Sequence, residues 1–274
     1  MPRSRVNGVE LYYEMTGSAG DPLVLVHGSW GDHHNWDALV PALARTFSVL
    51  TYDRRGHSQS ERPPGQGSVR EDVADLAALV EHLGLAPAHI VGSSLGGAIV
   101  LRLATERPEL YRSLIVHEPA LIALLADNPA NGPLVAGVLE RLQGVEERLS
   151  AGDAESGARF FVEEIALGPG TWAQLPPEMR RTFIANAPTF LDEMRDPEVA
   201  TMALSALADF SCPALLTQGD QSPPMFARIL DIVAAAMPQA ERRTLAGAGH
   251  VPHVTHPELY VHLVREFIRG ATAA

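Results

Sequence analysis

The stretch IVGSSLGG, residues 90–97, lies between a short apolar run and a segment whose apolar residues recur at helical spacing. It contains the pattern G-x-S-x-G, with Ser94 as the central serine. Directly after a strand and before a helix, this pattern is typical of a tight turn that exposes the serine hydroxyl at the carboxyl end of a sheet. We therefore predict that Ser94 is a nucleophile and that Ser93 beside it is a pocket residue.

Other apolar runs resemble the one before Ser94. They occupy residues 23–26, 47–52, 114–116 and 214–217 and are expected to be strands, the continuous apolar ones buried on both faces. Residues 241–245 are the last predicted strand. Asn7-Gly8 is a two-residue hairpin signal near the start of the chain.

Helical patterns separate these runs, at residues 68–83, 98–105, 225–236 and 259–268. Two pairs have capping-box spacing at helix starts, Ser68 with Glu71 and Thr255 with Glu258. Strands that alternate with helices predict an α/β fold, with a mostly parallel twisted sheet and helices on both faces.

The alternation stops once, between residues 119 and 207. This segment contains no convincing buried strand and reads as helices joined by turns rich in proline and glycine. We predict a helical cap at 119–207, inserted into a core made of residues 1–118 and 208–274. The cap carries several large apolar side chains, and Trp172 among them is expected to line a substrate pocket.

Charge and cysteine content limit the partners of the chain. The formal net charge is −12, from 21 basic and 33 acidic residues, which disfavours nucleic acid or an anionic membrane surface. The single cysteine, Cys212, excludes an intrachain disulfide. No apolar stretch has the length of a membrane span or of a secretory signal, so a cytoplasmic location is expected. No metal or organic cofactor is predicted, and the oligomeric state stays open.

A second glycine-containing loop, His27-Gly28-Ser29-Trp30, follows the apolar run at residues 23–26. A loop in this place can supply one backbone N–H to an oxyanion hole, and the residue after the nucleophile supplies the other. We assign these donors to Ser29 and Leu95. His27 is expected to hold the loop through hydrogen bonds, and Trp30 to form a wall of the pocket.

The candidate general base is His250, on a glycine-rich loop between the last predicted strand and the last helix. A serine hydroxyl is a weak nucleophile until a neighbouring imidazole accepts its proton. The chain has 11 histidines, and His250 is distinguished by this loop. His253, three residues later, is a candidate pocket residue.

Together these motifs resemble the α/β-hydrolase family, over nearly the whole chain. The matching residues are His27-Gly28, Asp53-Arg54-Arg55-Gly56, the turn around Ser94, and Gly249-His250. The resemblance implies a Ser–acid–His triad, with Asp53 and Arg55 bracing the core. A serine nucleophile argues against the branches of the family that use aspartate there.

The acid of the triad has two candidates. In most members it follows the late strand, three residues after a glycine, and here that position holds Ser222, two residues after Asp220. The alternative is Glu118, at the end of the strand that follows the Ser94 helix. Zearalenone-type lactonases resemble this chain in having a serine nucleophile and a glutamate in that place. We favour Glu118 and keep Asp220 as the alternative.

The leading hypothesis is a serine hydrolase that cleaves a small-molecule carboxylic ester or lactone through an acyl-enzyme on Ser94. Two other hypotheses stay open. The same residues serve hydrolysis of a carbon–carbon bond in a β-diketone-like ring-cleavage product, and a hydrolase-like receptor would bind a ligand with little turnover. The cap has no readable substrate code.

Overall fold

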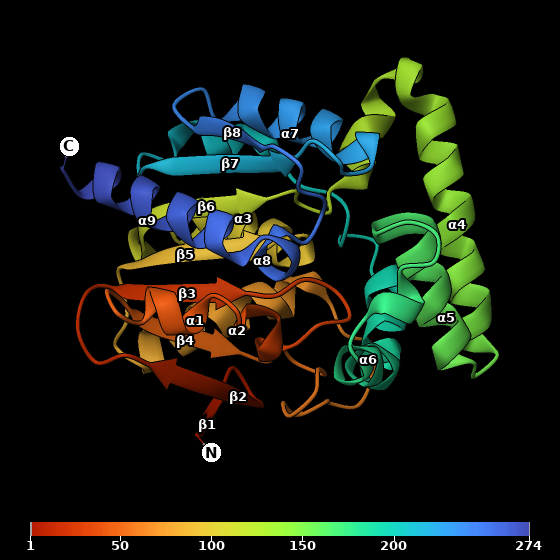
Figure 1. Cartoon of the computed structure of the whole chain (residues 1–274), viewed down its shortest axis with the longest axis horizontal. Coiled ribbons are helices and arrows are strands. Elements are labelled where there is room, and N and C mark those ends of the chain that lie inside the picture. The colour runs from red at the N-terminus through yellow and green to blue at the C-terminus, as the bar shows by residue number, and fades with distance from the viewer. Residues whose placement is uncertain (1, 274) are drawn as a thin grey trace.

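A single twisted sheet organises the computed structural model, which describes residues 2–273 (Figure 1). Its strands are β1 (Arg3–Val6), β2 (Val9–Thr16), β3 (Pro22–Val26), β4 (Ser48–Tyr52), β5 (Ala88–Ser93), β6 (Tyr111–His117), β7 (Ala214–Gly219) and β8 (Glu241–Leu245). They lie side by side in the order β1-β2-β4-β3-β5-β6-β7-β8. The neighbouring strands from β4 to β8 in this order are all parallel. The β1–β2 and β2–β4 pairs are antiparallel. The predicted α/β class is confirmed.

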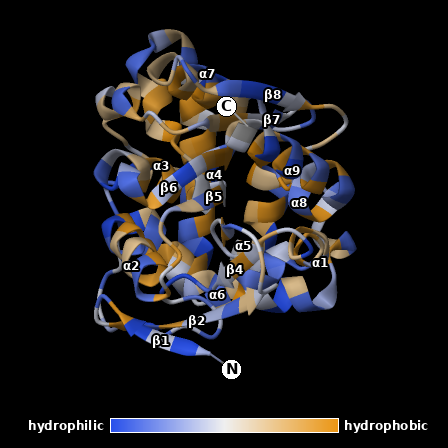
Figure 2. Cartoon of the chain, turned by 90° about the vertical axis from the view of Figure 1, so that its left-hand side faces the viewer, coloured by the Kyte–Doolittle hydropathy of each residue, from blue (hydrophilic) through white to orange (hydrophobic). Residues whose placement is uncertain are grey.

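Helices cover both faces of this sheet. The core helices are α1 (Val40–Leu43), α2 (Val69–His82), α3 (Leu95–Glu106), α7 (Pro224–Ala236), α8 (Pro252–Thr255) and α9 (Pro257–Ala273), with the short turns η1 (His33–Trp36) and η2 (Pro108–Leu110). Figure 2 shows α2 and α3 on one side of the strands and α1, α8 and α9 on the other. Side chains alternate along β3 between these two faces. Val24 and Val26 belong to an apolar cluster with residues of α2, α3 and α7, whereas Leu23 and Leu25 belong to one with residues of α1 and α9.

The segment between β6 and β7 is helical. It contains η3 (Ile122–Asp127), η4 (Pro129–Asn131), α4 (Gly132–Ser150), α5 (Ala154–Phe161), the π-helical turn η5 (Val162–Ala166), η6 (Trp172–Gln174), α6 (Pro177–Arg195) and η7 (Leu204–Asp209). Helices α4, α5 and α6 stand beyond the ends to which the parallel strands point (Figure 1). The boundaries of the cap, 119–207, stay a prediction.

Local sequence correctly predicted the first hairpin and the start of α2. Asn7 and Gly8 both have positive φ, 46° and 78°, and join β1 to β2 as predicted. Ser68 and Glu71 form a complete capping box at the start of α2.

The second predicted capping box is wrong. Thr255 ends the short helix α8 and donates its hydroxyl to the carbonyl oxygen of Val251 at 3.1 Å, so it does not cap the last helix. That helix, α9, begins at Pro257, which favours the first turn because it lacks an N–H to leave unpaired.

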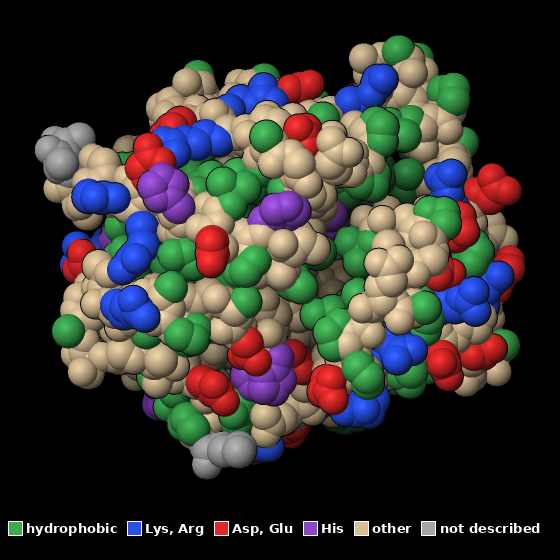
Figure 3. All heavy atoms as spheres, viewed as in Figure 1, with side chains coloured by type: hydrophobic (Ala, Val, Ile, Leu, Met, Phe, Trp, Pro, Cys, Tyr) green, Lys and Arg blue, Asp and Glu red, His purple; other side chains and the backbone are tan. Residues whose placement is uncertain are grey.

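On the face shown in Figure 3, arginine and acidic side chains are interspersed, and the surface is hollowed between the sheet on the left and the cap on the right. Among residues 2–273, no helix combines the length and the apolar character that crossing a bilayer requires.

The two capping-box pairs provide a stability prediction. Ser68→Ala should lower the free energy of unfolding by about 1 kcal/mol, because the N–H of Glu71 loses its acceptor. Thr255→Ala, the matched control, should change it by less than about 0.5 kcal/mol, because its hydroxyl is exposed and caps no long helix. Urea unfolding at equilibrium measures both, and equal losses would contradict the assignment.

Candidate active site

Ser94 lies in a strained turn between β5 and α3. Its φ is 57° and its ψ is −122°, a conformation that a residue with a side chain adopts only when its surroundings enforce it. The backbone around Ser94 is tightly packed, since a Cβ on Gly96 would lie 2.2 Å from the carbonyl oxygen of Val26. The N–H of Ser94 donates to the carbonyl oxygen of His117 at 3.0 Å, which ties the turn to the end of β6.

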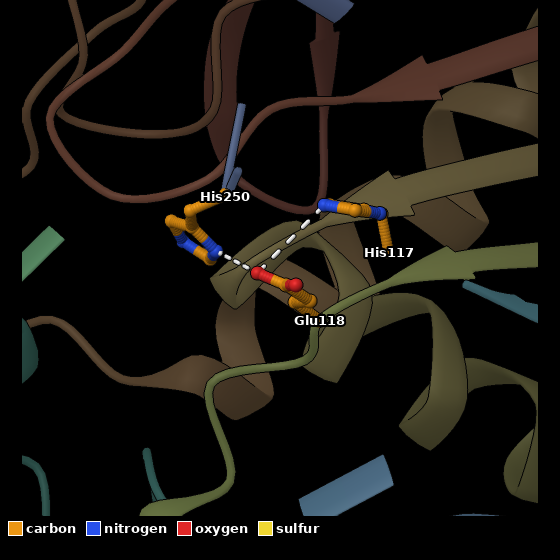
Figure 4. A group of neighbouring side chains, drawn as sticks. All are labelled: His117, Glu118 and His250. Carbon is orange, nitrogen blue, oxygen red and sulfur yellow. Dashed lines mark hydrogen bonds and ion pairs between the residues drawn. The ribbon is translucent and has the colours of Figure 1, made fainter. Parts of the chain in front are cut away.

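His250 and Glu118 form a buried pair at the same edge of the sheet (Figure 4). Nδ1 of His250 lies 2.7 Å from Oε2 of Glu118, and the other carboxylate oxygen accepts the N–H of Gly219 at 2.7 Å. Glu118 is fully buried, and His250 is 6% exposed. Phe226 stacks on the imidazole with ring centroids 4.1 Å apart. The ring of His250 is therefore oriented by one carboxylate and one aromatic face.

The charge of Glu118 is stabilised where it lies. Burial acts to raise its pKa, but the hydrogen bond with His250 and the neighbouring histidines outweigh burial and lower the pKa of Glu118 below its usual value. Glu118 also has a positive φ of 43°, so the chain turns sharply as it leaves β6. An ionised carboxylate on Nδ1 is the arrangement that stabilises an imidazolium during catalysis.

The alternative acid, Asp220, is exposed and faces elsewhere. Its Oδ1 accepts the N–H of Gly247 at 2.8 Å and the side-chain amide of Gln221 at 3.1 Å. Ser222, at the position that usually holds the acid, lies close enough to Glu118 to contribute to its lowered pKa. The geometry thus pairs His250 with Glu118 and not with Asp220, and the catalytic role of Glu118 stays a prediction.

The loop after β3 packs directly against the Ser94 turn. A Cβ at Gly28 would lie 2.9 Å from Cβ of Ser94, so only glycine permits this approach. His27 holds the loop, as predicted: its Nε2 accepts the N–H of Arg54 at 3.0 Å, and its Nδ1 lies 2.8 Å from the carbonyl oxygen of Gly28. Burial lowers the pKa of His27 to about 3, so the ring is neutral and exchanges no proton near pH 7.

A cavity of about 650 Å³ opens beside these groups. The site residues on its wall are Ser29, Ser94, Leu95 and His250. Most of the remaining wall is apolar, including Val138, Leu142, Phe161, Ile165, Phe190, Met194, Met225, Phe226 and Ile229. Its acidic residues are Glu146, Glu193 and Asp196, and no arginine or lysine among the described residues lines it.

The four predicted pocket residues lie elsewhere. Ser93, Trp30, Trp172 and His253 are buried and do not line the cavity. Trp30 stacks on Phe190 with centroids 4.3 Å apart, so it supports a wall residue from behind.

Two of these residues belong to packed interiors. Trp172 lies in the apolar interior of the cap, and His253 packs on Trp36 with centroids 4.6 Å apart. The actual wall residues come from helix faces that meet only after folding. Helical periodicity in the sequence predicts which side of a helix is apolar, but it does not indicate which of these apolar sides lines the cavity.

Within residues 2–273, two clusters bring together groups able to hold a metal ion. One is His117, Glu118 and His250, which includes the pair described above. The other contains Asp32, His33 and Asp53, whose carboxylates accept hydrogen bonds from the chain: Oδ1 of Asp53 lies 2.6 Å from Nδ1 of His33, and its Oδ2 accepts the N–H of Gln59 at 2.9 Å. The carboxylate oxygens of Asp53 and Nδ1 of His33 are thus engaged within the protein, whereas Nε2 of His33 and Nε2 of His117 have no hydrogen-bond partner among residues 2–273.

Comparison with known proteins places these features in a family. A stretch of 103 residues is 41% identical to the dihydrolipoyllysine-residue acetyltransferase component of the acetoin cleaving system of Pseudomonas putida, covering 38% of this chain and 28% of that protein. Over 247 residues, the chain is 27% identical to the pimeloyl-[acyl-carrier protein] methyl ester esterase of Neisseria meningitidis serogroup A, covering 90% of this chain and 76% of that one.

A solved structure agrees over the full length. The thermophilic esterase of Thermogutta terrifontis superposes with a TM-score of 0.80 at 25% identity, covering 99% of both chains. The family profile described as alpha/beta hydrolase fold matches residues 21–257. With the sheet order, the turn at Ser94 and the loop histidine all in place, this chain belongs to the α/β-hydrolase fold family.

Proposed function

We propose that this α/β hydrolase cleaves a neutral, largely apolar carboxylic ester or lactone by way of an acyl-enzyme on Ser94. The observation that carries the proposal is the 2.7 Å contact between His250 and Glu118 beside the cavity that Ser94 lines. The contact leaves Nε2 of His250 as the ring nitrogen that exchanges protons with Ser94. The similarity to esterases supports the same class of reaction.

The chemistry runs in two halves. Oγ of Ser94 attacks the carbonyl carbon while His250 takes its proton, and the N–H groups of Ser29 and Leu95 stabilise the oxyanion. The C–O bond to the leaving group then breaks, and His250 returns the proton to the departing alkoxide. Water attacks the acyl-enzyme with His250 again as base, which releases the carboxylic acid and restores Ser94.

The cavity wall limits the substrate. Aromatic and aliphatic side chains dominate it, and its charged residues are all acidic among the residues described. A substrate that carries a free carboxylate would meet like charge without a counter-ion, which is unfavourable at low dielectric. We therefore favour uncharged esters or lactones over anionic ring-cleavage products.

The nucleophile is tested with a fluorophosphonate probe. Wild type should label at one site and hydrolyse p-nitrophenyl esters, and Ser94→Ala should lose labelling and at least about 10³-fold of kcat, because no other hydroxyl replaces Oγ. Intact-protein and peptide mass spectrometry locate the label. Retained esterase activity in Ser94→Ala would refute the proposal. Turnover of a dienol substrate without ester turnover would support carbon–carbon hydrolysis instead, and binding without turnover would support a receptor.

The acid is tested with two carboxamide substitutions. Glu118→Gln should lower kcat by about 10²–10⁴-fold, because the imidazolium loses its compensating charge. Asp220→Asn, the matched control, should stay within about twofold, because Asp220 binds only Gly247 and Gln221. Steady-state kinetics with thermal melting as a check on folding compares them, and the reverse ranking would move the acid to Asp220.

A further inference from the structure

The peptide between Gly28 and Ser29 is anchored through its carbonyl oxygen. That oxygen accepts Nη1 of Arg54 at 3.2 Å and lies 2.8 Å from Nδ1 of His27. Because Nε2 of His27 accepts the N–H of Arg54, the proton of the neutral ring is on Nδ1, which donates to Gly28. The C=O and N–H of a trans peptide point in opposite directions, so the anchors aim the N–H of Ser29 away from Arg54.

Arg54 is itself held by two carboxylates from different parts of the chain. Asp72 of α2 binds it twice, to Nε and Nη2, both at 3.0 Å. Glu193 of the cap helix α6 accepts from Nη2 at 2.7 Å. Arg54 is 1% exposed. The guanidinium that fixes the Gly28 carbonyl is thus positioned jointly by the core and by the cap.

Glu193 is not needed to balance the charge of Arg54. The buried cluster has one guanidinium and two carboxylates, and burial lowers the pKa of neighbouring His57 well below its usual value, which keeps that ring neutral. Glu193 is 9% exposed, its Oε2 has no hydrogen-bond partner among residues 2–273, and burial raises its pKa. A buried carboxyl without full compensation is unfavourable for stability, which indicates another reason for its presence.

We propose that Glu193 is a positioning residue through which the cap sets the oxyanion hole: it holds Arg54, which holds the Gly28 carbonyl and so directs the Ser29 N–H. Glu193 also lines the cavity with Ser29 and Ser94, so a cap docked with α6 in place completes the donor geometry. The inference rests on the proposed acyl transfer at Ser94. In this proposal, docking of the cap contributes to stabilisation of the transition state as well as to substrate binding.

The test replaces Glu193 by two side chains of similar size. Glu193→Met removes the acceptor and should lower kcat for a p-nitrophenyl ester about 10-fold or more, with KM within about threefold, because an oxyanion donor is misplaced. The variant should fold, with a Tm equal to or above wild type, since Arg54 and Asp72 remain a balanced pair. Glu193→Gln keeps an acceptor for Nη2 and should restore most of kcat.

A neighbouring residue provides the matched control. Asp192 also joins α6 to a core arginine, with its Oδ2 2.5 Å from Nη2 of Arg62, but Arg62 makes no contact with Gly28 among the hydrogen bonds of residues 2–273. Asp192→Asn should leave kcat within about twofold.

A trifluoromethyl ketone, whose serine adduct carries an oxyanion, separates positioning from a general loss of structure. Its inhibition constant should rise in Glu193→Met by the same factor by which kcat/KM falls, and not in Asp192→Asn. Equal effects of the two variants, a change confined to KM, or no rescue by Glu193→Gln would overturn the inference alone. Wild type that neither labels with fluorophosphonate nor hydrolyses esters would instead overturn the proposed function, and the inference with it.

Discussion

Close backbone packing at the Ser94 turn constrains the rest of the site. The chain reverses between β5 and α3 with a positive φ at Ser94, and Gly96 lies so close to the carbonyl of Val26 that a side chain there would clash. Since β3, β5 and β6 are adjacent and parallel, their carboxyl ends leave the sheet at one edge. The turn therefore brings Ser94 against Gly28 on one side and the His117 carbonyl on the other. Close packing at this turn thus brings together Ser94, the loop that carries Gly28 and the segment that leads to Glu118.

Two buried carboxyl groups near this edge, Glu118 and Glu193, differ in the hydrogen-bond donors that they have. Glu118 has a donor on each oxygen, and its pKa is lowered despite full burial. Glu193 has one guanidinium donor that it shares with Asp72, and its pKa is raised. The first arrangement keeps a negative charge available to His250. The second is weak evidence for stability, which is consistent with the proposed positioning role of Glu193.

The cavity reflects the division between core and cap. Ser29, Ser94 and His250 come from turns and loops at the sheet edge, whereas most of the apolar wall comes from helices between β6 and β7 and from α7. Trp30 bridges the two, since it follows the oxyanion loop and stacks on Phe190 of α6. The same helix, α6, carries both Phe190 of the cavity wall and Glu193, which binds Arg54.

Local sequence patterns predicted much of the secondary structure and two residues of the candidate site. Apolar runs and helical spacing predicted the strands and core helices, and the G-x-S-x-G turn with the loop histidine indicated Ser94 and His250, because these signals are short-range. Tertiary structure decided the rest. Thr255 matched a capping box but ends another helix, Trp172 and His253 are aromatic but packed inside, and the partner of His250 depends on which strand end reaches it. Glu118 and Asp220 have equal chemistry in the sequence. Position along the chain and the family resemblance favoured Glu118, but the contact with His250 depends on tertiary structure. Glu118 is buried at the end of β6, whereas Asp220, after the neighbouring strand β7, stays exposed.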